Sequence, residues 1–100
     1  MSYQLDIRPG ALADIEAAGD WYEQQQPGLG ADFSRTIQQA ISALPSNPLI
    51  YCIREQRRQI RWVIPPRFPY YIVYRVKGDL ITIVAVIHAA RHDREWRRRA

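Results

Sequence analysis

Apolar and polar residues follow two different periods along this chain. Residues 3–8 alternate, which predicts a strand. After Pro9-Gly10, apolar residues recur every three or four positions to residue 26, and again from Leu29 to Leu44. Because Pro27-Gly28 interrupts this spacing, the sequence predicts two helices in an antiparallel hairpin. The two apolar stripes are Leu12, Ile15, Ala18, Gly19 and Tyr22, then Leu29, Phe33, Ile37, Ala40, Ile41 and Leu44.

The second half of the chain reads as three strands joined by turns. Residues 60–64 place Ile60, Trp62 and Ile64 on one face, and Pro65-Pro66 ends the run. Residues 69–76 alternate in the same way, and Lys77-Gly78-Asp79 provides a hairpin turn. Residues 80–88 are apolar at nearly every position, which predicts a central strand covered on both faces. No secure element is predicted for residues 54–58.

These elements predict an α+β fold with the order β-α-α-β-β-β, in which a helical hairpin packs on a mainly antiparallel sheet. One hundred residues suffice for a single domain, 1–100. The tail, residues 91–100, is basic, carries Trp96 and has room for one or two helical turns. So little chain remains beyond the last strand that we expect the outer face of the sheet to stay largely exposed, as a binding site would.

Composition narrows the function classes. The longest apolar stretch, Leu80 to Ile87, is far shorter than the ~20 residues that span a bilayer. Residues 1–6 lack the basic start and apolar run of a secretory signal, so we expect a cytoplasmic protein. Cys52, the only cysteine, excludes an internal disulfide and is expected to be a small buried side chain. His92 has only Asp93 and Glu95 beside it as further ligands, so no metal or other cofactor is predicted.

Charge is divided unevenly between the two halves. Residues 1–50 hold two basic and six acidic side chains, giving −4, and residues 51–100 hold twelve and four, giving +8. A basic half attracts nucleic acid or an acidic protein, and arginines also keep sheet edges soluble and unpaired. Direct nucleic-acid binding therefore stays open.

Particular residues then carry a family resemblance. They are Asp20-Trp21-Tyr22-Glu23, Pro27-Gly28-Leu29-Gly30, Phe33, Arg67-Phe68-Pro69-Tyr70, Tyr74-Arg75-Val76, Gly78-Asp79, Ala85-Val86-Ile87-His88 and Arg91. In this order, from about residue 3 to residue 96, the chain resembles the RelE/ParE superfamily of bacterial type II toxins, particularly its ParE-like, plasmid-stabilisation branch. The resemblance implies a toxin that a cognate antitoxin wraps and neutralises, in a higher-order toxin–antitoxin complex.

The superfamily contains two activities, and the resemblance alone does not choose between them. RelE-like members cleave messenger RNA on the ribosome, which requires a base, cations and an acid. Here His88, Arg61 and Arg91 would form that set, but no tyrosine follows Tyr74, and Trp96 stands about where the family has one. ParE-like members inhibit DNA gyrase by binding, which this sequence fits better. An interaction module that has lost toxicity is the third reading.

Several side chains have both a functional and a structural interpretation. His88 is either a general base or a cap that closes the end of the sheet, and Arg75 either contacts a target or pairs with Asp20 or Glu23. Trp21 and Tyr22 are expected between helix and sheet. Arg94, Arg97, Arg98 and Arg99 are expected mainly in a solvated tail. The predicted contacts to target or antitoxin are Arg61, Trp62, Arg67, Arg75, Arg91 and Trp96.

The last hypothesis from the sequence concerns the antitoxin. We expect an acidic segment, disordered when free, to fold along the sheet and the helical hairpin. Its apolar side chains would be buried on the exposed outer face, and its carboxylates would meet the arginines.

Overall fold

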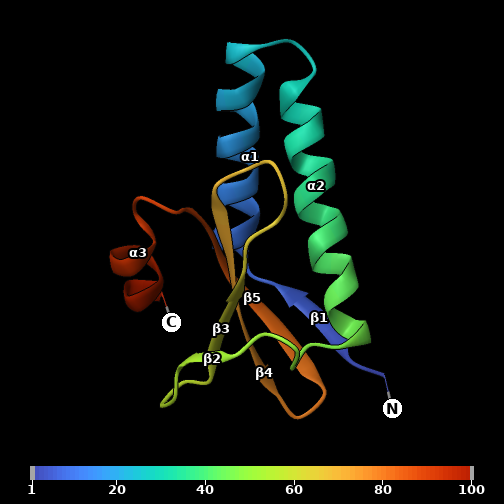
Figure 1. Cartoon of the computed structure of the whole chain (residues 1–100), viewed down its shortest axis with the longest axis vertical. Coiled ribbons are helices and arrows are strands. Elements are labelled where there is room, and N and C mark those ends of the chain that lie inside the picture. Colours follow the sequence, from blue (N-terminus) through green and yellow to red (C-terminus); the bar gives the residue numbers. More distant parts are fainter. Residues whose placement is uncertain (1, 100) are drawn as a thin grey trace.

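The computed structural model describes residues 2–99, and of residues 92–95 it describes the backbone alone. It confirms the α+β fold and the predicted order, and adds a short strand in the region where no element was predicted (Figure 1). The tail forms an eight-residue helix, about two turns, where one or two turns were predicted. The elements are β1 (Gln4–Ile7), α1 (Pro9–Gln25), α2 (Leu29–Ala43), the 3-10 turn η1 (Leu44–Ser46), β2 (Ile53–Glu55), β3 (Ile60–Val63), β4 (Tyr70–Lys77), β5 (Leu80–His88) and α3 (His92–Arg99).

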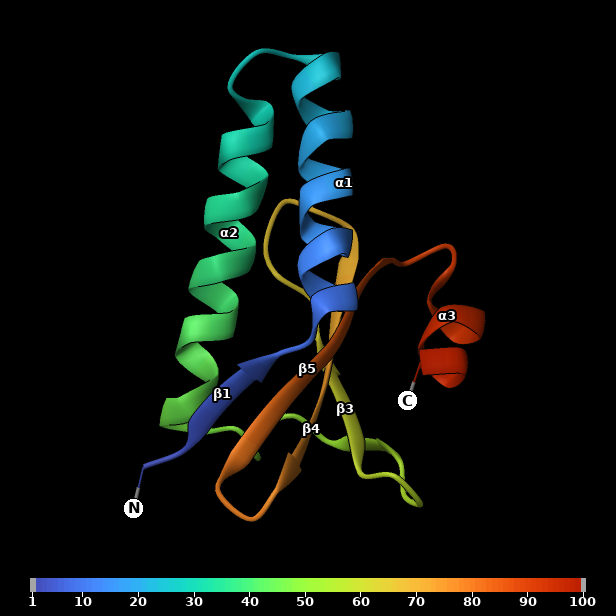
Figure 2. The same cartoon turned by 180° about the vertical axis from the view of Figure 1, so that it is seen from behind.

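The strands form one sheet in the order β1-β5-β4-β3-β2. β1 runs parallel to β5, as the view from behind shows (Figure 2), and the other neighbours are antiparallel. β5 lies between β1 and β4, which confirms that this apolar strand is an inner one. The short β2, and not β3, forms the edge beyond β4. Gly78 takes a φ of 62° in the β4–β5 turn, the conformation that glycine adopts without strain.

The two helices form the predicted antiparallel hairpin and cover one face of the sheet (Figures 1 and 2). They approach closely where Gly30 meets Gly19, because a Cβ on Gly30 would lie 2.5 Å from the Gly19 carbonyl oxygen. The Glu23 carboxylate fixes the corner by accepting the N–H groups of Gly28 and Gly30 at 3.0 Å. The stripe on α2 is buried as predicted, with Phe33, Ile37 and Ile41 in the core.

The phase predicted for α1 is wrong at one position. Leu12 is 53% exposed, and Ala11 is buried in its place with Ile15, Ala18 and Gly19. Adjacent residues of a helix point about 100° apart, so Ala11 and Leu12 cannot both face the sheet. The small side chain at Ala11 lets the first turn of the helix lie close to the sheet.

The apolar middle of the outer face of the sheet is covered, contrary to the expectation from the sequence, while Trp62 and Arg75 on the same face are half-buried. Trp96 of α3 is 2% exposed and packs on this face. The register between β4 and β5 shifts at Val84, where a bulge turns both Val84 and Ala85 toward Trp96. Trp96 therefore covers the apolar middle of the outer face, which was expected to stay exposed. The buried residues of this outer cluster are Ile60, Val73, Val84, Ala85, Ile87 and Trp96.

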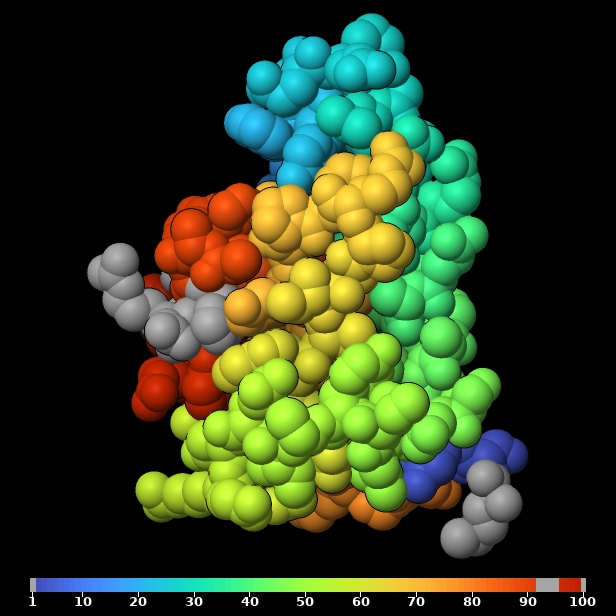
Figure 3. Space-filling view, in the orientation of Figure 1, coloured from blue at the N-terminus to red at the C-terminus, as the bar shows by residue number. Residues whose placement is uncertain are grey.

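The segment between β3 and β4 joins the sheet to the hairpin. β3 ends at Val63, so the predicted strand of residues 60–64 was one residue too long, and Ile64 lies beyond β3 and is 54% exposed. Phe68 inserts between the helices and the sheet, with ring centroids 5.0 Å from Tyr22 and 5.1 Å from Phe33. Residues 64–69 lie in front of the hairpin in the space-filling view (Figure 3). No helix in the described part of the chain is both long and apolar enough to cross a membrane.

Candidate functional site

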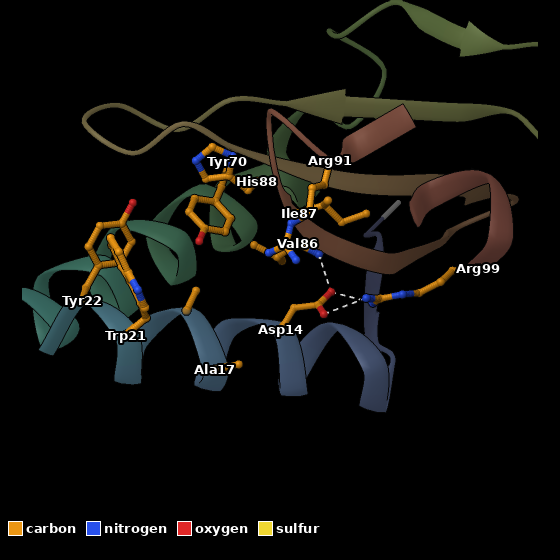
Figure 4. A pocket seen from close by; sticks show the side chains of 11 residues that line it. Asp14, Ala17, Trp21, Tyr22, Tyr70, Val86, Ile87, His88, Arg91 and Arg99 are labelled. Carbon is orange, nitrogen blue, oxygen red and sulfur yellow. Dashed lines mark hydrogen bonds and ion pairs between the residues drawn. The ribbon is translucent and has the colours of Figure 1, made fainter. Parts of the chain in front are cut away.

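A cleft of about 620 Å³ opens between α1, the end of β5 and α3 (Figure 4). It exists because β1 pairs with β5 only as far as Ile83, after which the chain turns into α1. The edge of β5 beyond Ile83 therefore faces the helix, with no strand beside it. The residues that line the cleft are Asp14, Ala17, Ala18, Trp21, Tyr22, Tyr70, Val86, Ile87, His88, Arg91 and Arg99.

Asp14 holds one end of the cleft closed. Its carboxylate accepts two hydrogen bonds from the Arg99 guanidinium, at 2.6 and 2.8 Å, and a third from the Val86 N–H at 2.9 Å (Figure 4). The Arg99 carbonyl in turn accepts a bond of 3.3 Å from Arg8. These contacts fasten the end of α3 to α1, so the expectation that Arg99 belongs to a solvated tail is wrong. Bidentate pairing of a half-buried arginine fixes its position better than an exposed ion pair does.

The other polar groups of the cleft are hydrogen-bond donors. Burial raises the pKa of the Tyr22 hydroxyl. The pKa of Tyr70 is also raised, mainly by burial and to a smaller extent by the nearby Tyr22 hydroxyl. Both hydroxyls are therefore protonated at neutral pH. His88 Nδ1 accepts the Ala90 N–H at 3.0 Å, which leaves Nε2 to carry the proton of the neutral ring. The His88 ring lies edge-on to Tyr70, with centroids 5.2 Å apart. Arg91 adds an exposed guanidinium to this wall.

Trp21 forms part of the rim and is 55% exposed. The expectation that it packs between helix and sheet holds only for its neighbour Tyr22, which contacts Phe33, Phe68 and Tyr70. Trp21 makes an edge-on contact with Tyr22 of that cluster, at 5.1 Å between centroids. A large aromatic ring exposed beside a cleft is typical of a binding surface.

A second surface, which we call the arginine–aromatic face, lies on the other side of the sheet. Trp62 stacks on Tyr71, with centroids 5.5 Å apart and planes within 14°, and meets Trp96 at 5.8 Å. Guanidinium groups lie over these rings at 5.1–5.6 Å from the ring centroids, within cation–π range. Trp96 itself is buried and unavailable to a partner while α3 is in place. The arginines concerned are Arg54, Arg58 and Arg97.

Two of the predicted contact arginines are engaged within the chain. Arg61 donates to the carbonyl of Tyr51 at 2.5 Å, and so holds the loop after η1 against β3. Arg67 lies 3.6 Å from the Asp32 carboxylate and adopts a positive φ of 76°. Arg67 remains exposed and so accessible to a partner, whereas the contact of Arg61 is structural.

Arg75 cannot make the predicted pair with Asp20 or Glu23. It alternates with the buried Tyr74 and therefore faces away from the helices. The Glu23 carboxylate is already occupied by the backbone of residues 28 and 30. Cys52, expected to be buried, is exposed.

The structure divides the residues proposed for RNA cleavage. His88 and Arg91 lie together in the cleft. In the sheet register, Arg61 of β3 lies opposite Tyr74 on one side of β4, and His88 of β5 lies opposite Tyr70 on the other side. The backbones of Arg61 and His88 are therefore roughly 16 Å apart at standard strand spacings. His92, Asp93, Arg94 and Glu95 fall in the segment whose side chains are not described. Among the side chains that are described, no three His, Cys, Asp or Glu residues are close enough to hold a metal.

Sequence reasoning missed Asp14, Tyr70 and Arg99 as parts of a site. They come from α1, β4 and α3, and only the tertiary fold brings them together. Trp21 was the local sequence signal for a site on α1, because this large apolar residue lies outside both apolar stripes of the helices.

Comparisons with known proteins identify the family. The family described as ParE toxin of type II toxin-antitoxin system, parDE, matches residues 5–93. The chain belongs to this ParE toxin family. No curated protein matches it in sequence.

Two solved structures share the fold of this ParE-family chain. A chain of the chromosomal ParDE TA system from P. aeruginosa is 24% identical, with a TM-score of 0.76 over 86% of this chain and 95% of that chain. The E. coli toxin RelE, in a doubly arginine-to-alanine mutated free state, is 17% identical, with a TM-score of 0.69 over 100% of this chain and 95% of that chain. At these identities the likeness shows the fold alone, and it confirms the predicted RelE/ParE-like architecture.

Proposed function

We propose that this ParE-family toxin inhibits DNA gyrase by direct binding, and that a cognate antitoxin neutralises it in the cytoplasm. Membership of the family supports the toxin role. The observation that carries the choice of mechanism is the separation of Arg61 from His88. Their backbones lie roughly 16 Å apart at standard strand spacings, and the Arg61 guanidinium is held by the Tyr51 carbonyl, which does not favour the two side chains acting on one phosphate.

The two residues are also bound to other parts of the chain. The Arg61 guanidinium contacts a backbone carbonyl, and His88 Nδ1 accepts a backbone N–H. The indole of Trp96 is buried between α3 and the sheet and has no acidic proton to offer a leaving group. These arrangements support a protein that acts by contact. The exposed Arg67 and Arg91 and the half-buried Trp62 and Arg75 are then the predicted residues still open to a target.

One observation favours the alternative, a ribosome-dependent endoribonuclease. His88, Arg91 and the hydroxyls of Tyr22 and Tyr70 border one cleft, which would bring a base, a cation and donors near a phosphate. Both hydroxyls have raised pKa values, however, and this makes them poorer acids for a leaving oxygen. The alternative therefore has less support.

Expression of the chain and of its His88→Ala variant in bacteria separates the two mechanisms. Under the proposal both proteins arrest growth, plasmid DNA loses negative supercoils within one generation, and messenger RNA half-lives are unchanged at first. Rapid transcript cleavage by the parent protein with loss of toxicity in His88→Ala would support the ribonuclease instead. Growth unaffected by either protein, at confirmed soluble expression, would indicate a module without toxicity.

A further inference from the structure

We propose that the cleft between α1, β5 and α3 receives an apolar side chain and a neighbouring carboxylate from an acidic segment of the antitoxin. This inference rests on the proposed function, because it needs an antitoxin as the occupant. The sequence predicted an antitoxin segment along the sheet and the helical hairpin with its apolar anchors on the outer face, and this inference moves the anchor to a cleft on the helix side. The outer face is already covered by Trp96.

The polar groups of the cleft select for an anion. Asp14 is the carboxylate among the described residues that line it, and it already accepts three hydrogen bonds from Arg99 and Val86. What remains on the walls is the Arg91 guanidinium, the protonated Nε2 of His88 and the hydroxyls of Tyr22 and Tyr70. All of these can donate a hydrogen bond, and the guanidinium carries a permanent positive charge. A carboxylate, with a single negative charge, complements this set better than a phosphate dianion does.

The apolar walls determine what accompanies the charge. Ala17, Ala18, Val86 and Ile87 line the cleft, and Trp21 stands exposed at its rim (Figure 4). Ala17 is exposed and contributes only a methyl group, so the helix leaves space for a side chain from another molecule. Burial of an apolar side chain here lowers the free energy of binding, because apolar surface leaves water. Tryptophan, which stands at the rim, is a residue type enriched at interfaces. The same site thus offers an apolar seat and an anion contact.

The charge of the chain supports an acidic protein segment as the occupant. Residues 51–100 carry a net charge of +8, and both Arg91 and Arg99 of the cleft belong to this half. A segment that is acidic and disordered when free would be attracted to this half and could fold into the cleft on binding. Among the described side chains that line the cleft, Arg91 is the guanidinium without a carboxylate partner, and the phosphate dianion of a mononucleotide carries more negative charge than one guanidinium balances.

Matched substitutions on α1 test the apolar seat. Ala17→Phe fills the cleft from an exposed position, whereas Ala13→Phe adds the same ring to an exposed alanine that does not line it. Arg91→Glu reverses the charge in the cleft, and Arg57→Glu reverses an exposed arginine elsewhere. The candidate antitoxin is the product of the neighbouring gene, and its affinity for each variant is measured by calorimetry after circular dichroism has shown that the variant is folded.

We expect Ala17→Phe and Arg91→Glu each to weaken binding about tenfold or more, and the two controls to change it by less than about threefold. Equal affinity of Ala17→Phe and Ala13→Phe would overturn the inference and leave the proposed function intact. Failure of the unaltered chain to bind the antitoxin would overturn both. The two failures are therefore distinguishable.

A defined probe tests the ligand chemistry without the antitoxin. N-acetyl-L-phenylalanine has an apolar side chain beside a carboxylate, and its amide lacks the charge. In nuclear magnetic resonance titrations we expect the acid to shift the Trp21 indole N–H signal more strongly than the amide does, and Ala17→Phe to remove the shift. A stronger shift with uridine monophosphate, or equal shifts with acid and amide, would contradict a carboxylate site.

Discussion

The two faces of the sheet are covered in different ways. The helix-side face packs against a hairpin of two long helices, and near the end of β5 this cover leaves a cleft edged with donors. The outer face is closed by an eight-residue helix through one tryptophan. Trp96 on the outer face therefore contributes mainly to stability, whereas the helix side, which contains the cleft, can receive a partner. The contrast predicts opposite consequences for tryptophans on the two sides.

The largest effect is expected where the outer face is closed. Trp96→Ala removes the ring that covers Val84 and Ala85 and should lower the free energy of unfolding by about 3–5 kcal/mol. Urea denaturation followed by circular dichroism measures the change. A loss below about 1 kcal/mol would mean that α3 is not needed to close this face.

The next effect concerns the ion pair that fastens α3 to α1. Arg99→Ala leaves the half-buried Asp14 carboxylate with fewer donors and should cost about 1–3 kcal/mol of stability. Arg35→Ala breaks an exposed pair with Asp32 and should cost less than about 0.5 kcal/mol. Equal losses in the two variants, measured by the same urea titration, would show that the geometry at Asp14 contributes nothing special.

Alkaline pH tests the core on the helix side. Burial raises the pKa of Tyr74 to about 12, and its hydroxyl donates to the Pro48 carbonyl at 2.8 Å. Between pH 10 and 12 the unfolded chain loses this proton and the folded chain keeps it, so stability falls as pH rises, by on the order of 2 kcal/mol. Below pH 10 the hydroxyl is protonated in both states and the effect is absent.

The matched variant for this pH effect is Tyr74→Phe. It loses one hydrogen bond at every pH, but it should show a shallower decline between pH 10 and 12 than the unaltered chain. Urea midpoints at pH 8, 10 and 11 compare the two proteins. Parallel declines would contradict a raised pKa at Tyr74.

The smallest effect on folding is expected at the rim of the cleft. Trp21→Ala should change the free energy of unfolding by less than about 0.5 kcal/mol, because the ring is largely exposed. The same substitution should weaken antitoxin binding. A variant that unfolds easily and binds normally would reverse the assignment of the two faces.

Periodicity sufficed to predict the hairpin, the meander and the two-sided burial of β5. It could not place Leu12 correctly, because Ala11 and Leu12 are both apolar and the buried stripe of α1 can begin at either residue. It also left the outer face open, since nothing local shows that Trp96 folds back across Ala85. The cleft was beyond prediction, because Asp14 and Arg99 are 85 residues apart in sequence.

Inhibition of gyrase by direct binding is the activity proposed for this ParE-family chain. The direct test is supercoiling of relaxed plasmid by purified gyrase, at micromolar concentrations of the purified chain, with and without its antitoxin. We expect supercoiling to stop as the chain is added and to recover when an equimolar amount of antitoxin is added. Normal supercoiling at these concentrations, together with messenger RNA cleavage by the same preparation on ribosomes, would contradict it.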